Sequence, residues 1–174
     1  MIDILIKYNF FDNFNYLKDE FKKIKLYNLE DYNNETNSKE NWPGLRSKNL
    51  FIENKFLTAL YVNQIRKYNI IDPNVRFNVN LHVHLRLSED DSKDWIHKDI
   101  QGGCFLSGIT YLSDTNLKSG TIFYTEDEQK CSEVNALQNT SVFFNPAVNH
   151  KSGLNYGDSL ENGRLTLNAF FFKI

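Results

Sequence analysis

The chain lacks most of the sequence features that mark secreted, membrane or nucleic-acid-binding proteins. It has only two cysteines, Cys104 and Cys131, far apart and outside any metal-ligand spacing, which favours a reduced intracellular protein over a disulfide scaffold. No long basic run is present and the formal net charge is −2, so nothing indicates a phosphate-backbone partner. Asp3 and Lys7 interrupt the apolar residues at the N-terminus, which argues against a signal peptide or a membrane span there.

What is present is the composition of a packed globular protein. The 174 residues are 41% hydrophobic and 14% aromatic, enough to build one sizeable core. No internal repeat or low-complexity segment is evident. We expect a single cytoplasmic domain over residues 1–174, in which residues 1–72 pack as a strand and helices against a core formed by residues 73–174.

The spacing of the apolar residues changes near Pro73. Before it, apolar residues recur every three or four positions in two stretches, which predicts helices, and the first has Asp12 or Asn13 as its N-cap. Asp72-Pro73 ends the second helix, since proline cannot continue the hydrogen-bond ladder. The elements predicted there are a strand at 2–7, a helix at 10–26, a loop at 30–39, a turn at 42–44 and a helix at 49–67.

Beyond Pro73 the period is two. From Val75 to Leu87 apolar residues alternate with polar ones, which predicts a long strand with one apolar and one polar face. Further strands are predicted at 104–112, 121–125, 140–144 and 165–172. Short strands separated by turns favour an antiparallel sandwich or barrel, with the two helices outside one sheet. The predicted class is therefore mainly β, α+β.

Three residues in this second part have the character of metal ligands. His97 and Asp99 lie two apart, and alternate residues of an extended segment point the same way, roughly 6.6 Å apart. His150 must reach the same ion from another strand. Two imidazoles and one carboxylate that leave coordination positions open are the donor set that suits non-haem Fe(II).

Arg164 opens an apolar, strand-like segment shortly after His150. Three ligands on one face of an octahedron leave three positions, enough for the keto oxygen and carboxylate of a 2-oxo acid and for O₂. The far carboxylate of such an acid then needs a cation, and the planar fork of arginine binds a carboxylate bidentately. Strand alternation places Thr166 to donate to that carboxylate and Asn168 to orient a metal-bound one.

The order His97, Asp99, His150 and Arg164 resembles the Fe(II)- and 2-oxoglutarate-dependent dioxygenases, especially their prolyl-hydroxylase-like branch of phage and bacterial type. Three further segments resemble that branch, and the match covers about residues 75–172. They are Ile109-Thr110-Tyr111-Leu112-Ser113, Ser119-Gly120-Thr121-Ile122-Phe123 and Asn145-Pro146-Ala147-Val148-Asn149-His150.

This resemblance implies a double-stranded β-helix (jelly roll) flanked by the N-terminal helices. It implies an enzyme that hydroxylates a C–H bond while 2-oxoglutarate is decarboxylated to succinate, with Fe(II) as cofactor, O₂ as oxidant and ascorbate as reductant. Tyr111 takes the position of a tyrosine that donates to the co-substrate carboxylate. Asp99 argues against a halogenase, because its carboxylate fills the site that a halide needs. Arg164 lies further beyond His150 than is common, which predicts that residues 152–162 form a loop over the mouth.

The substrate class follows less directly from the residues. The branch resemblance favours a peptidyl proline or another peptide residue, followed by a free amino acid or small metabolite, in the cytoplasm of the cell or of a phage host. A nucleobase is disfavoured, because Phe170 stands where nucleic-acid demethylases of this superfamily carry a second arginine. His84 and Arg86, on the polar side of the long strand, are candidates for substrate contact. No membrane partner is expected.

Two other functions are compatible with the same residues. One is a non-catalytic jelly-roll module that binds a sugar or a protein and keeps a vestigial metal site. The other is a cupin-like metalloenzyme that does not use 2-oxoglutarate. Turnover of 2-oxoglutarate distinguishes the first from an oxygenase, and indifference to loss of Arg164 identifies the second.

Overall fold

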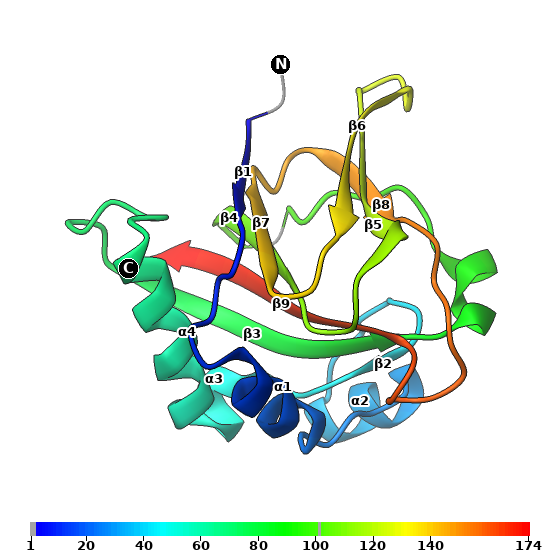
Figure 1. Ribbon diagram of the computed structural model, residues 1–174, viewed down its shortest axis with the longest axis horizontal. Helices are drawn as coiled ribbons and strands as arrows, with labels where there is room; N and C mark the ends of the chain where they lie inside the picture. Colours follow the sequence, from blue (N-terminus) through cyan, green and yellow to red (C-terminus); the bar gives the residue numbers. More distant parts are fainter. Residues whose placement is uncertain (1–2, 101) are drawn as a thin grey trace.

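The computed structural model describes residues 3–100 and 102–174, so Ile2 of the predicted N-terminal strand lies outside the described part. It consists of two antiparallel β-sheets with helices against the larger one (Figure 1). The helices are α1 (Phe14–Lys22), α2 (Leu29–Thr36), α3 (Leu50–Glu53), α4 (Lys55–Lys67) and a 3₁₀ helix, η1 (Ser88–Lys93). The strands are β1 (Ile4–Lys7), β2 (Leu45–Arg46), β3 (Phe77–Arg86), β4 (Cys104–Tyr111), β5 (Asn116–Tyr124), β6 (Lys130–Ala136), β7 (Thr140–Phe144), β8 (Asn149–Ser152) and β9 (Arg164–Lys173).

The larger sheet has the order β1-β7-β4-β9-β3-β2, and the smaller one has the order β6-β5-β8. β3 and β9 are the longest strands and pair along their full length, from Phe77 opposite Lys173 to Arg86 opposite Arg164. Their side chains alternate between the two faces of the sheet. One face therefore carries Leu81, Leu167 and their apolar neighbours, while the other carries the polar residues.

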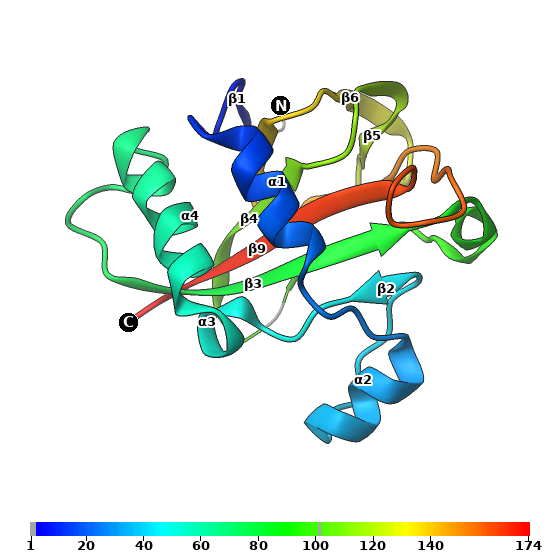
Figure 2. The same cartoon turned by 60° about the horizontal axis from the view of Figure 1, so that its bottom comes forward.

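The apolar face of β3 and β9 packs against α1, α3 and α4. Figure 2 shows α1 and α4 across one side of the sheet. Tyr61 of α4 stacks on Phe171 of β9, with ring centroids 6.3 Å apart. Leu17 and Phe21 of α1 are buried in the same cluster. Burying large apolar side chains contributes roughly 1.5–3 kcal/mol each, so this layer holds the two longest strands rigidly.

A smaller core lies between the two sheets and joins β5 and β6 to β4 and β7. It contains the buried residues Tyr111, Phe123, Val134, Ala136, Val142 and Phe144. Gly120 is required here because a Cβ atom at this position would lie 1.7 Å from the carbonyl oxygen of Val134 on β6. The glycine of the Ser119-Gly120 motif thus lets two strands approach closely.

The predicted class, mainly β with N-terminal helices, is confirmed, but several boundaries were wrong. Residues 30–39, predicted as a loop, contain most of α2, because the Asn28 side chain caps it by accepting from the Asp31 N–H and Tyr32 packs on Trp42. The helix predicted at 49–67 is divided into α3 and α4 at Asn54. The prediction omitted β2, β6 and β8. β2 and β8 are short, and β6 is mostly exposed and buries only Val134 and Ala136.

The polar face of β3 differs most from a simple amphipathic strand. His82, His84 and Arg86 are buried, because this face looks into the space between the two sheets and not into solvent. A polar face enclosed in this way lines a cavity. No helix in the described residues is long and apolar enough to span a membrane.

Candidate metal centre and its cavity

His97, Asp99 and His150 converge at one side of this cavity. The three side chains offer ligand atoms that all lie within 4.8 Å of one another. The Asp99 carboxylate is 3.4 Å from Nε2 of His150 and 3.9 Å from Nε2 of His97. Donor atoms about 2.1 Å from a shared ion and at right angles are about 3 Å apart, so a small inward movement completes the site. The structure thus brings together the three residues predicted as ligands.

Backbone pairing brings these side chains together. The segment that carries His97 and Asp99 runs antiparallel to the one leading into β8. His97 and His150 exchange two backbone hydrogen bonds of 2.9 Å, and the Asp99 N–H donates to the Pro146 carbonyl at 2.8 Å. Two residues two apart therefore face His150 across a short ladder, as the extended spacing predicted.

Both imidazoles are oriented by their second ring nitrogen. Nδ1 of His97 lies 3.0 Å from the Trp95 carbonyl, and Nδ1 of His150 lies 2.9 Å from the Val148 carbonyl. A carbonyl only accepts, so Nδ1 carries the hydrogen in each ring and the Nε2 lone pair is free for a metal. Burial lowers the pKa of His150, which keeps this ring neutral. The donor set and its orientation fit an Fe(II) ion.

Arg164 lies at the start of β9 on the cavity wall. Its Nε donates to the Ser119 carbonyl at 3.0 Å and its Nη2 to the Gly120 carbonyl at 3.1 Å, which fixes the guanidinium. Burial lowers its pKa to about 10, so it remains charged at neutral pH. Among the residues described, no carboxylate lies within 4 Å of it. Its charge is therefore available to an anion in the cavity.

Tyr111 and Thr166 are neighbours of Arg164, but both are engaged within the protein. The guanidinium carbon of Arg164 lies 5.8 Å from the Tyr111 ring centroid, and the Tyr111 hydroxyl is 2.7 Å from the Thr121 hydroxyl, which belongs to the cavity wall. Thr166 donates to the Asn168 side-chain oxygen at 2.9 Å. Direct contact of either residue with a co-substrate stays a prediction.

Arg86 faces the cavity as predicted, but its charge is already paired. It forms an ion pair of 2.7 Å with Asp94, and the side chains of the two residues are only 8% and 3% exposed. Asp94 also accepts from the N–H and hydroxyl of Ser152. Burial alone raises the pKa of Asp94, but Arg86 and Ser152 outweigh it and hold this pKa below its usual value. The pair joins β3, β8 and the segment before His97.

His84 also lies on the cavity wall, where Nε2 is 2.8 Å from the Pro43 carbonyl. Burial, then the nearby Arg86 and Arg46, lower its pKa well below the usual value, so the ring is neutral. His82, two residues earlier on β3, is also buried, and its Nδ1 lies 3.0 Å from the Ser47 carbonyl. The predicted role of His84 in substrate contact is compatible with its place but is not tested by it.

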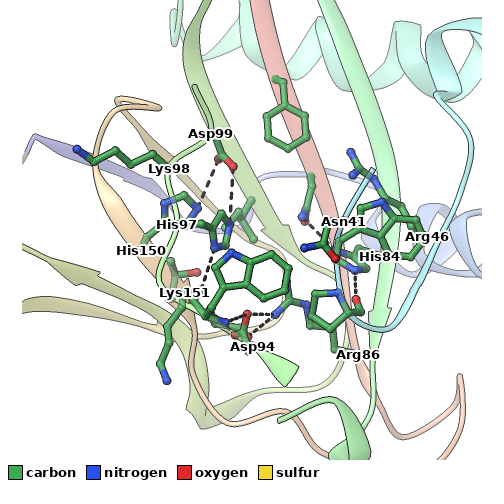
Figure 3. Close-up of a pocket in the computed structure, with 18 of the residues that line it drawn as sticks. Asn41, Arg46, His84, Arg86, Asp94, His97, Lys98, Asp99, His150 and Lys151 are labelled. Carbon is green, nitrogen blue, oxygen red and sulfur yellow. Dashed lines mark hydrogen bonds and ion pairs between the residues drawn. The ribbon is translucent and has the colours of Figure 1, made fainter. Parts of the chain in front are cut away.

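Asp94 and Arg46 also line the cavity, and neither was among the predicted site residues. Figure 3 shows His97, Asp99 and His150 on one side of the cavity, Asn41, Arg46 and His84 on the other, and the pair Arg86–Asp94 below. Residues 152–162 were predicted to form a loop over the mouth, but of these only Ser152, at the end of β8, is among the residues that line the cavity. The rest of this loop contacts η1, where the Gly157 carbonyl accepts from the Ser88 N–H, and the segment after β4, where the Tyr156 hydroxyl donates to Ser113.

No protein-family model matches the sequence, and no curated protein matches it. Solved structures do match over nearly the whole chain. A 2OG-Fe(II) oxygenase family oxidoreductase from Burkholderia pseudomallei has a TM-score of 0.67 at 11% identity, covering 97% of this chain and 84% of that one. A Pseudomonas putida prolyl-4-hydroxylase has a TM-score of 0.65 at 13% identity, covering 100% and 94%. A Trichoplax adhaerens prolyl hydroxylase, solved with a hypoxia-inducible-factor peptide, has a TM-score of 0.64 at 13% identity, covering 97% and 83%. The predicted double-stranded β-helix is thus confirmed as the fold.

Proposed function

We propose that the protein is an Fe(II)- and 2-oxoglutarate-dependent oxygenase that hydroxylates a C–H bond and releases succinate and CO₂. One observation carries the proposal: the open triad of His97, Asp99 and His150 shares a cavity with Arg164, a fixed guanidinium that has no acidic partner among the described residues. The shared fold with 2-oxoglutarate oxygenases supports it.

In this proposal His97, Asp99 and His150 hold Fe(II), which when bound activates O₂ for oxidation of a C–H bond. The Nδ1 hydrogen bonds of the two histidines keep both Nε2 atoms directed at the ion. Phe144 packs edge-on against His150, with ring centroids 4.6 Å apart, and shields it from water. The residues thus supply three ligands in fixed positions and leave the cavity side open.

Arg164 binds the distal carboxylate of 2-oxoglutarate. Two of its nitrogens are anchored by backbone carbonyls, so little conformational entropy is lost when the remaining N–H groups bind a ligand. Tyr111 supports the guanidinium from one side and orients the Thr121 hydroxyl at the wall. Thr166 holds Asn168, which itself lines the cavity.

The substrate proposed is a peptidyl residue, such as proline, or a free amino acid, and not a nucleic acid. The Trichoplax relative in fold was solved with a peptide, which supports the first class. We also propose that residues 1–174 act as one domain, because α1 and α4 complete the core beneath β3 and β9. A cytoplasmic location is part of the same proposal.

The test is succinate formation from 2-oxoglutarate with Fe(II), ascorbate and O₂, without added substrate. Wild type is compared with His97→Ala, Arg164→Met and the exposed control Arg76→Met. His97→Ala should abolish turnover. Arg164→Met should raise the KM for 2-oxoglutarate about tenfold to hundredfold, as expected for loss of charge-assisted hydrogen bonds.

If turnover without substrate is too slow to measure, the binding of Mn(II) and 2-oxoglutarate to the protein is measured by calorimetric titration instead. Failure of wild type to bind 2-oxoglutarate would refute the proposal and leave a binding module. Metal-dependent oxidation that is unaffected by Arg164→Met would identify the cupin-like alternative.

A further inference from the structure

A second guanidinium, that of Arg46, lies in the cavity wall across from the metal triad (Figure 3). It belongs to β2, which pairs with β3 at the sheet edge and places Arg46 opposite His84. The guanidinium carbon lies over two aromatic rings, 5.8 Å from the centroid of Trp42 and 5.7 Å from that of Phe170. Such contacts offset part of the cost of desolvating the cation but offer no acceptor to its N–H groups.

The Arg46 side chain forms no hydrogen bond and no ion pair with any residue in the described ranges, and its Nε is a buried donor without a partner. Burial lowers the pKa of this guanidinium, and Glu40 and Asp99, the carboxylates that oppose the shift, are not within 4 Å. A buried donor without an acceptor destabilises the protein, and more so when the group is charged. Arg46 therefore occupies a position that a ligand acceptor would complete.

The charge of the cavity points the same way. Five cationic side chains line it against three carboxylates, although the whole chain carries −2. Asp94 neutralises Arg86, and Glu126, outside the cavity, neutralises Lys98. Asp99 is committed to the metal and Arg164 to the co-substrate. The lining residues Lys151 and Glu40 are of opposite sign and cancel in the count. Arg46, which forms no ion pair within the described residues, supplies the remaining positive charge on the opposite wall, where a bound anion is favoured.

We propose that Arg46 binds a carboxylate of the substrate, and that this enzyme therefore oxidises an acidic compound held between Arg46 and the metal. The proposal rests on the proposed function. The planar fork of arginine matches a carboxylate bidentately. The cavity volume is about 240 Å³, below the roughly 300–1,000 Å³ of sites for drug-sized ligands, so the part of the substrate inside is a small acid or a single acidic side chain.

The experiment measures binding to protein loaded with Mn(II) and 2-oxoglutarate. The probes are free L-amino acids paired with their carboxamides. The second set contains the α-amides of N-acetyl-aspartate and N-acetyl-glutamate, in which the side-chain carboxylate is the only acidic group. Each is paired with the α-amide of N-acetyl-asparagine or N-acetyl-glutamine, which has no acidic group. Line broadening of probe protons by Mn(II) reports binding inside the cavity. The first set tests a free acid as the source of the carboxylate, and the second tests an acidic peptide.

At least one acid should bind tenfold or more tightly than its amide. Arg46→Met, which keeps an apolar stem against Trp42 and Phe170, should weaken binding of that acid at least tenfold and binding of its amide less than threefold. Arg76→Met is the control for loss of an exposed charge. Equal loss for acid and amide would mean that Arg46 only shapes the wall, which overturns the inference.

Three other results would also overturn it: no acid preferred over its amide, a preference that persists in Arg46→Met, or a tenfold loss of 2-oxoglutarate affinity in Arg46→Met. The last would make Arg46 a co-substrate residue. The experiment also distinguishes failure of the proposed function. In that case the wild-type protein would not bind 2-oxoglutarate, and this would be seen before any probe is added.

Discussion

The buried pair between Arg86 and Asp94 allows a prediction of defined size. Asp94→Asn keeps the shape of the side chain but leaves Arg86 charged, buried and without a counter-ion. Removing one partner of a buried ion pair typically costs 3–5 kcal/mol, because the remaining charge is no longer solvated or paired; we expect a loss of about 3–5 kcal/mol here. For a chain of this length that lowers the melting temperature by about 6–20 °C.

The assay is urea unfolding of the metal-free protein at neutral pH, followed by fluorescence. The double variant Arg86→Met/Asp94→Leu removes both charges and should be within about 1 kcal/mol of wild type, since apolar replacement of a buried pair is often neutral or stabilising. A loss below about 1 kcal/mol for Asp94→Asn, or a double variant as unstable as the single one, would refute the reasoning.

The same pair predicts a pH dependence. Because the folded-state pKa of Asp94 is held below its usual value, ionised Asp94 stabilises the fold above the unfolded-state pKa, and this contribution is lost as pH falls through the folded-state value. The difference in unfolding free energy between wild type and Asp94→Asn should therefore be full at pH 6–7 and shrink below about pH 4. A difference that stays constant down to pH 2 would contradict the assigned cause.

Two further predictions concern strand packing and the metal. Gly120→Ala should destabilise the fold by about 3 kcal/mol or more, because its Cβ meets a backbone carbonyl at 1.7 Å, whereas Gly108→Ala, whose Cβ meets ring atoms of Phe143 at 2.9 Å, should cost less; chemical denaturation of both variants compares them. Mn(II) at a hundred times its Kd should raise the unfolding free energy of wild type by about 2.7 kcal/mol, and this gain should vanish in His150→Ala, as thermal unfolding with and without the ion will show.

The sequence predicts the parts of the site that depend on local spacing. His97 and Asp99 share a side because residues two apart on an extended segment do so, and the structure places both opposite His150. The alternation from Val75 to Leu87 predicts β3 itself. Alternation shows only that the two faces of a strand differ in polarity. It does not show whether the polar face contacts solvent or a cavity inside the protein. His84 and Arg86 on the polar face of β3 were predicted to contact substrate, but the burial of His82, His84 and Arg86 did not follow from the alternation.

The features that the sequence does not predict depend on contacts between distant segments. α2 buries only Tyr32, so its apolar pattern is weak, and it is held by a cap at Asn28 and by packing on Trp42. Arg46 follows the predicted turn at 42–44, but nothing in the local sequence predicts that its side chain lines the cavity without a hydrogen-bond partner. In the sequence nothing distinguishes Asp94 from the other acidic residues near η1. Only the fold places it beside Arg86, at an ion-pair distance of 2.7 Å.

β3 and β9 support both the core and the cavity, and this dual role constrains their register. On one face Leu85 and Leu165 pack toward the helices, while on the other Arg86 and Arg164 lie side by side in the cavity wall. A slip of one residue in either strand would turn its charged residues into the apolar core and its leucines into the cavity. Both errors cost several kcal/mol, since a charge buried without a partner and a lost apolar contact are each unfavourable. The buried polar face of the two long strands therefore helps to specify the fold as well as to line the cavity.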